Sequence, residues 1–312
     1  MNNFIPSTTI LNRYAKVLVN FALNSGKGIK PGDVVLCTVP DVAKPLALQL
    51  QNTILKAGGQ PLIRLTPTGF NKDFFTLANQ SQLTFFPKKY LKAKAELIDH
   101  EIGIIADVDP YELSSVNPKK IFIKRDSQKP YIDWLVDKEV KGKHTWTVGL
   151  WATPAKAKLV HLSLKAYWDQ IIKACFLDQP DPLRRWQQVC SLQTAILNQL
   201  NRLTISSLHL LGPAVDLHLT LGPDRLWQGG SGRNIPSFEI FTSPDWRHAR
   251  GWFKANQPLY RYGNLVKDIY LEFNRGRVVK AKAKIGNHLL QQMLKSSNAD
   301  KLGEFSLTDK RL

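Results

Sequence analysis

The chain has 312 residues, of which 43% are hydrophobic and 22% charged, the balance of a globular protein with room for two domains. Its longest apolar runs fall far short of the ~20 residues that a membrane helix needs, and its first residues lack the pattern of a secretory signal. Three widely spaced cysteines, Cys37, Cys175 and Cys190, each stand among apolar neighbours. The cysteine pattern predicts buried thiols in a cytoplasmic protein, while the short apolar runs exclude a membrane-spanning protein and the first residues argue against an exported one.

Lys and Arg number 43 against 25 Asp and Glu, a formal charge of +18. Such an excess attracts polyanions over long distances, so nucleic acid is one partner to consider. The basic residues are scattered, however, and zinc-finger spacing, an RNP-like aromatic motif and a continuous basic helix are all missing. We therefore expect a generally basic, solvated surface without a dedicated nucleic-acid groove.

Helical and strand patterns alternate through the first two thirds of the chain. A helix capped by Ser7 or Thr8 is predicted to end at Gly26 to Gly28, and a second runs from about Val42 to the Gly58-Gly59 pair. Apolar runs predict strands at residues 33–39, 61–65, 102–106, 120–123 and 145–152. The segments between them are long enough for crossovers, and helices at 164–176 and 183–203 follow. The pattern predicts an N-terminal α/β domain with a mostly parallel sheet over residues 1–204.

The pattern changes beyond Thr204. Strands are predicted at 209–211, 215–221, 269–273 and 279–285, with a Gly-rich loop at 229–232 and a short helix at 287–295. The last two strands alternate apolar and polar residues around a turn at 274–276, as in a hairpin with one solvated face. Residues 205–312 are thus expected to form a separate, strand-rich α+β domain.

Common short motifs for metal, nucleotide and acyl chemistry are absent, so candidate residues are few. Asp216 and His218 share a strand face and could serve a metal or a catalytic pair, although the outward polar side of an alternating strand is the interpretation we favour. The Gly-rich loop does not sit clearly between a strand and a helix, so we favour a turn over a phosphate cradle.

Glu239 is the carboxylate that most needs an explanation. It lies among Phe238, Ile240 and Phe241, where burial is costly unless a cation or hydrogen-bond donors neutralise the charge. Glu304 follows Gly303, where the chain can bend and expose a carboxylate. A shared metal site is one interpretation; a buried hydrogen-bond acceptor and a helix cap are the alternatives.

Three segments of the sequence resemble the motifs of a known protein family. Gly212-Pro213 followed by Asp216-Leu217, the stretch from Asn234 to Pro244, and Leu302-Gly303-Glu304 are similar to motifs of metallo-aminopeptidases of the aminopeptidase T, aminopeptidase II and aminopeptidase S type. The resemblance spans the chain and is stronger after residue 204. One departure is Phe238, where many members have glycine, which places bulk beside the carboxylate.

The resemblance implies that Glu239 and Glu304 are ligands of a two-metal site holding Zn, Co or Mn, with Glu304 the better candidate to bridge both ions. Two divalent ions ~4 Å apart can activate a water, polarise a peptide carbonyl and anchor a free α-amine. The family also implies peptide substrates and a homodimer of subunits with an α/β N-terminal domain and a separate catalytic domain.

Family members continue beyond Leu-Gly-Glu into segments with His and Asp ligands and a catalytic Tyr. None of these can be assigned before Leu312, so we expect a C-terminally truncated copy with an incomplete catalytic domain. The leading hypothesis is a metal-dependent aminopeptidase. The alternatives are an inactive relative acting as a binding or scaffold protein, and a basic nucleic-acid-binding protein.

Overall fold

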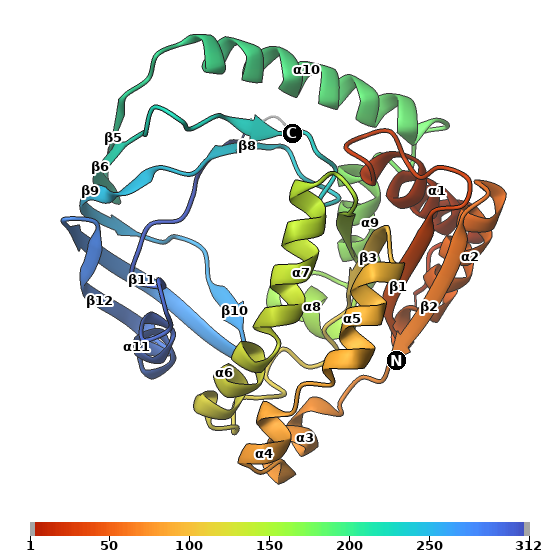
Figure 1. Ribbon diagram of the computed structural model, residues 1–312, viewed down its shortest axis with the longest axis horizontal. Coiled ribbons are helices and arrows are strands. Elements are labelled where there is room, and N and C mark those ends of the chain that lie inside the picture. Colours follow the sequence, from red (N-terminus) through yellow and green to blue (C-terminus); the bar gives the residue numbers. More distant parts are fainter. Residues whose placement is uncertain (1–3, 309–312) are drawn as a thin grey trace.

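A computed structural model describes residues 4–308 of the chain (Figure 1). The first part contains the helices α1 (Thr8–Val17), α2 (Lys44–Lys56), α3 (Asn71–Leu77), α4 (Gln80–Thr84), α5 (Lys88–Leu97), α6 (Pro118–Ser127), α7 (Lys129–Val140), α8 (Pro154–Leu159), α9 (Leu164–Ala174) and α10 (Pro182–Arg202). A π-helical turn, η1 (Leu18–Ala22), continues α1, and a short 3₁₀ turn, η2 (Asp41–Ala43), precedes α2. The strands of this part are β1 (Val34–Pro40), β2 (Gln60–Thr66), β3 (His100–Ile105) and β4 (Thr145–Leu150).

The second part consists mostly of strands. They are β5 (Ser207–Gly212), β6 (Val215–Thr220), β7 (Gln228–Gly229), β8 (Glu239–Thr242), β9 (Asp245–Lys254), β10 (Leu259–Arg261), β11 (Asn264–Asn274), β12 (Arg277–Ile285) and β13 (Phe305–Thr308), with one helix, α11 (Asn287–Leu294).

The four N-terminal strands form one wholly parallel sheet in the order β2-β1-β3-β4. Crossover helices connect them, as parallel pairing requires. The Ser7 hydroxyl accepts a hydrogen bond from the Ile10 amide and so caps α1, as predicted from the sequence. The predicted α/β fold of the N-terminal region is confirmed.

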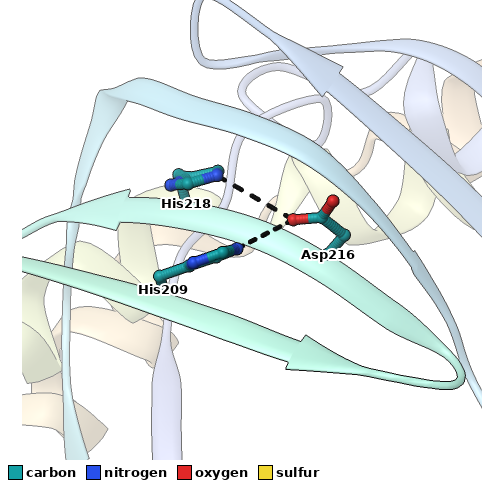
Figure 2. A group of neighbouring side chains, drawn as sticks. All are labelled: His209, Asp216 and His218. Carbon is teal, nitrogen blue, oxygen red and sulfur yellow. Dashed lines mark hydrogen bonds and ion pairs between the residues drawn. The ribbon is translucent and has the colours of Figure 1, made fainter.

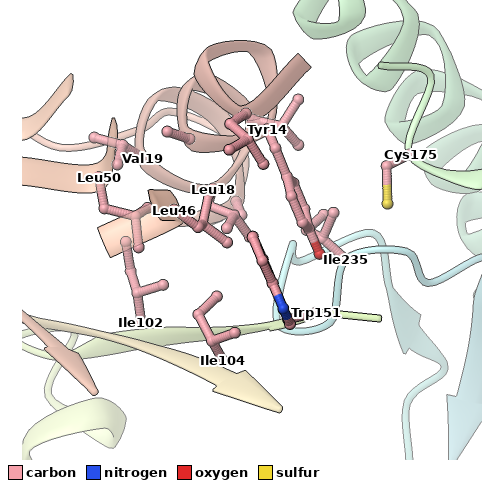
Figure 3. Close-up of a cluster of buried hydrophobic side chains, with 14 of the residues drawn as sticks. Tyr14, Leu18, Val19, Leu46, Leu50, Ile102, Ile104, Trp151, Cys175 and Ile235 are labelled. Atoms are coloured by element: carbon pink, nitrogen blue, oxygen red, sulfur yellow. The ribbon is translucent and has the colours of Figure 1, made fainter. Parts of the chain in front are cut away.

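The largest hydrophobic core lies between this sheet and the helices around α1 (Figure 3). Tyr14 and Trp168 are fully buried in it, and the Tyr14 hydroxyl accepts a hydrogen bond from the Leu150 amide at 2.7 Å. Ile235, from the second part of the chain, is 2% exposed and belongs to the same core. The segment around Ile235 is therefore anchored to the N-terminal region by burial of apolar surface.

Beyond residue 204 the sheets are antiparallel. One has the order β10-β11-β9-β6-β5 with β12 paired to β11, and a smaller one has the order β13-β8-β7. The long helix α10 runs along one side of the molecule from the parallel sheet to β5 (Figure 1). A strand-rich second part is thus confirmed, and a division near residue 204, just after α10, remains our proposal.

One predicted strand is wrong: residues 120–123 lie inside α6. Asn117 caps this helix by accepting a hydrogen bond from the Lys119 amide, and Pro118 occupies its first turn. A run of four apolar-leaning residues does not distinguish a strand from a helix, and here the Asn-Pro start is the deciding signal. A smaller correction concerns Cys190, which is only half-buried, whereas Cys37 and Cys175 are buried; all three are free thiols.

Within residues 4–308, no helix combines the length and the apolar character that crossing a membrane demands.

Acid sensitivity of folding is predicted from His144, which is 3% exposed. Among residues 4–308 its two ring nitrogens find no hydrogen-bond partner, and desolvation lowers the pKa of the ring to about 4. The folded state thus resists protonation that the unfolded chain accepts near pH 6.5, so stability present above pH 6.5 is lost as the pH falls towards 4. We expect this loss to reach roughly 3 kcal/mol and to disappear in His144→Leu. Urea unfolding of both proteins at pH 7 and pH 4.5 measures it; an equal loss in both would contradict the prediction.

Candidate metal centre

The segment that carries the Asn234 to Pro244 motif is attached to the edge of the parallel sheet. Asn234 forms a parallel bridge with Val148 of β4: the Val148 amide donates to Arg233 O and the Ile235 amide donates to Val148 O, both at 2.9 Å. The Thr147 hydroxyl also donates to Gly232 O at 2.7 Å. These bonds fix the start of the motif against a rigid strand.

Phe238 turns into the hydrophobic core. Its ring stacks on Trp186 with centroids 5.4 Å apart and planes within 7°, and it meets Phe176 edge-on at 6.1 Å. Since successive residues of an extended chain point to opposite sides, Glu239 points away from this cluster. The bulk that replaces the family's glycine therefore fills the core, and Phe238 does not line the cavity beside Glu239.

Glu239 and Glu304 line the same cavity, whose volume is about 290 Å³. Antiparallel pairing of β8 with β13 brings these two distant segments side by side, with Phe305 opposite Thr242 and Thr308 opposite Glu239, so that Glu239 and Glu304 lie towards opposite ends of the strand pair. Glu304 immediately precedes β13 and is exposed, as its position after Gly303 predicted. The other lining residues are Trp146, Gly229, Gly230, Ser231, Gly232, Arg233, Asn234, Ser237 and Phe241.

Both acidic and basic side chains line this cavity. Desolvation, together with the nearby Glu239 carboxylate, raises the pKa of Glu304. Arg233 carries the opposite charge, but an ion pair with Glu139 of α7 neutralises it, and its guanidinium lies 5.7 Å from the centre of the Trp146 ring. The cavity therefore presents two carboxylates whose mutual repulsion a cation would relieve.

Other predicted candidates lie elsewhere. Asp216 and His218 do share a face of β6, as predicted, but they lie on the large antiparallel sheet, where His218 lines a different groove. Within residues 4–308, no third His, Cys, Asp or Glu joins Glu239 and Glu304 in a group with metal-ligand spacing. Sequence reasoning did not find Trp146, because nothing in the sequence indicates that β4 would pair with residue 234.

The Gly-rich loop is packed closely at both ends. A Cβ on Gly229 would lie 2.6 Å from Glu239 O, and one on Gly232, whose φ is +76°, would lie 2.3 Å from Ala22 O. These glycines let the loop approach two backbone segments closely. This close packing is consistent with the turn that the sequence analysis favoured over a phosphate cradle.

Gly232→Ala is expected to destabilise the protein by at least about 2 kcal/mol, because the new methyl group meets a backbone oxygen at a positive φ. Gly142→Ala is the matched control: its φ is also positive, at +66°, but its Cβ would meet nothing within 4 Å. Thermal unfolding of the two variants should show the larger decrease for Gly232→Ala, and equal decreases would refute the packing argument.

Comparison with known proteins agrees with the motifs. The family described as thermophilic metalloprotease (M29) matches residues 7–311. The chain is 25% identical to aminopeptidase PepS of Streptococcus thermophilus, covering 95% of this chain and 76% of that protein, and 29% identical to aminopeptidase T of Thermus thermophilus, covering 95% and 77%.

The fold is also similar to a solved structure, wild-type AmpT from Thermus thermophilus. The TM-score is 0.81 at 23% sequence identity, and the match covers 96% of this chain and 78% of that one. The resemblance inferred from the sequence motifs is thus confirmed: the chain belongs to the thermophilic metalloprotease (M29) family.

Proposed function

We propose that the protein is a metal-dependent aminopeptidase that removes N-terminal residues from peptides, with Glu239 and Glu304 as metal ligands. The observation that carries the proposal is the convergence of these two carboxylates, 65 positions apart in sequence, on one cavity of a metalloprotease-family fold. Relatives named aminopeptidase support the exopeptidase activity.

The donor atoms around the cavity fit divalent ions. Glu239 and Glu304 supply carboxylate oxygens, and Asn234 and Ser237 add neutral oxygen donors to the lining. Hard oxygen ligands suit ions such as Mn²⁺, and carboxylates also bind Zn²⁺ and Co²⁺. We propose two ions of Zn, Co or Mn, with Glu304 bridging them. When bound, the ions would supply Lewis acidity that polarises the peptide carbonyl and makes a water nucleophilic near neutral pH.

The chain's own residues would position the peptide. A neutral free α-amine would be anchored by the ions that Glu239 and Glu304 hold, which distinguishes the N-terminus of a peptide from its interior. Trp146 and Phe241 offer apolar surface to the first side chain. Arg233, held by Glu139, offers donors to a carbonyl further along the substrate. A cytoplasmic location, predicted from the pattern of the three cysteines, and a homodimer, implied by the sequence resemblance, belong to the same proposal.

Hydrolysis of aminoacyl-p-nitroanilides by the purified protein tests the function. We expect turnover that requires added Zn²⁺, Co²⁺ or Mn²⁺, that stops with EDTA, and that is absent with N-acetylated substrates, because acetylation removes the α-amine. Failure of every metal to support turnover would contradict the aminopeptidase proposal and favour a binding or scaffold role. Equal hydrolysis of blocked substrates would contradict the exopeptidase assignment alone.

A further inference from the structure

A second group of possible metal ligands lies on the β5–β6 hairpin, on a different sheet from Glu239 (Figure 2). His209 Nε2 lies 2.9 Å from Asp216 Oδ1, and His218 Nε2 lies 3.8 Å from the same oxygen. One ligand atom from each of the three residues lies within 4.8 Å of the other two. Within residues 4–308 this is the one group of three or more His, Cys, Asp or Glu with such spacing.

The hairpin itself produces this arrangement. A tight turn at Pro213 and Ala214 follows Gly212, which pairs with Val215, and this register places His209 directly across from His218. Asp216 is two residues before His218 and so shares its face. The two imidazole rings consequently lie side by side, with centroids 3.9 Å apart and planes within 11°, and the carboxylate faces both rings.

Two imidazole nitrogens and one carboxylate oxygen are typical zinc ligands. Bonds of about 2.1 Å at a tetrahedral angle place donor atoms about 3.4 Å apart, so the separations of 2.9 and 3.8 Å bracket that value. An ion between parallel rings would lie about 2 Å out of both ring planes, so binding requires the rings to tilt towards each other. Their side chains are 44% and 40% exposed, which leaves them room to turn.

The surrounding charges limit the affinity without excluding a cation. Arg247 lines the same groove but is held by Asp245, with Nη2 and Oδ2 2.7 Å apart. Arg250 pairs across the strands with His218 and is exposed, so its guanidinium can move away into solvent. Two neutral imidazoles with one carboxylate carry a single negative charge, which a divalent ion more than neutralises.

We propose that His209, Asp216 and His218 form a zinc site that ties β5 to β6, separate from the cavity that contains Glu239 and Glu304. The two places share no lining residue. Three protein ligands leave a fourth position open to the groove for water.

The test is zinc binding by tag-free, full-length protein carrying Glu239→Gln and Glu304→Gln, which removes the other carboxylate pair. Equilibrium dialysis should find one Zn²⁺ per chain, and Co²⁺ should give the visible absorption of a four-coordinate site. Adding Asp216→Asn or His218→Ala should weaken zinc binding at least tenfold. His248→Ala, which changes another histidine lining the same groove, should alter it less than twofold.

Circular dichroism establishes whether each variant is folded. If a histidine variant does not fold, Asp216→Asn, which keeps the size of the side chain, is used for the test. Absence of zinc binding in the starting variant overturns the proposal. So does binding that survives Asp216→Asn, or binding that His248→Ala weakens equally. Binding of inorganic phosphate in place of zinc would identify the groove as an anion site and also overturn it. None of these results bears on the aminopeptidase activity.

Discussion

Replacing Glu239 by glutamine is expected to lower kcat/KM for aminoacyl-p-nitroanilides at least about 100-fold. Loss of an outer hydrogen-bond partner of a metal ligand already costs about 10- to 100-fold in affinity or activity, and loss of the ligand itself should cost no less. Glutamine keeps the size of the side chain and only removes its charge, so the half-buried position at the start of β8 should remain intact.

Glu96→Gln provides the control for this variant. Glu96 is an exposed carboxylate on α5 that pairs with Lys92 at 3.7 Å, and such surface pairs contribute less than about 1 kcal/mol. Its activity should equal that of the unaltered protein. If Glu239→Gln retained more than half of the activity under saturating metal, Glu239 could not be a ligand of the catalytic ions.

Trp186→Ala is expected to cost about 3–5 kcal/mol of stability, the usual range for emptying the site of a large core aromatic. Trp186 is 2% exposed and stacks between Phe21, at 5.7 Å, and Phe238, at 5.4 Å. Its indole nitrogen donates to Cys175 O at 3.2 Å. The cavity left behind would remove the ring on which Phe238 stacks. Because Phe238 directly precedes Glu239, the carboxylate would then be less well positioned, and this variant should lose activity as well as stability.

Trp252→Ala is the comparison for this prediction. Trp252 is only half-buried on β9 and stacks on Tyr270 at 5.9 Å. It belongs to the large antiparallel sheet and not to the N-terminal core. Its loss should lower the free energy of unfolding by clearly less than that of Trp186. Urea unfolding of both variants measures the difference, and a cost below 1 kcal/mol for Trp186→Ala would show that the aromatic cluster is not a major source of stability.

Much of the fold is predictable from local patterns. The strands β1, β3 and β4 are short, partly buried apolar runs between crossovers, which is typical of parallel strands, and β2 is an apolar run at the exposed edge of the same sheet. The β11–β12 hairpin follows from alternation around a turn. Residues 120–123 are the exception, because a brief apolar run is ambiguous and the capping residue Asn117 was the evidence to weigh.

The site was predictable only in part. Motif similarity singled out Glu239 and Glu304, but their common cavity depends on long-range pairing of β8 with β13, which no local pattern specifies. Trp146 enters that cavity through another long-range contact. His209 could have been found: counting back from the Gly212-Pro213 turn places it opposite His218, the same register that the hairpin shows.

The most direct test of a shared metal centre is Mn²⁺ affinity, followed by electron paramagnetic resonance, in an Asp216→Asn background. Glu239→Gln and Glu304→Gln should each weaken binding at least about tenfold, and the double variant should be little weaker than either, because both changes break one site. Mn²⁺ affinity that stays unchanged in both single variants, or losses that simply add, would contradict the claim that these two carboxylates hold the same ions.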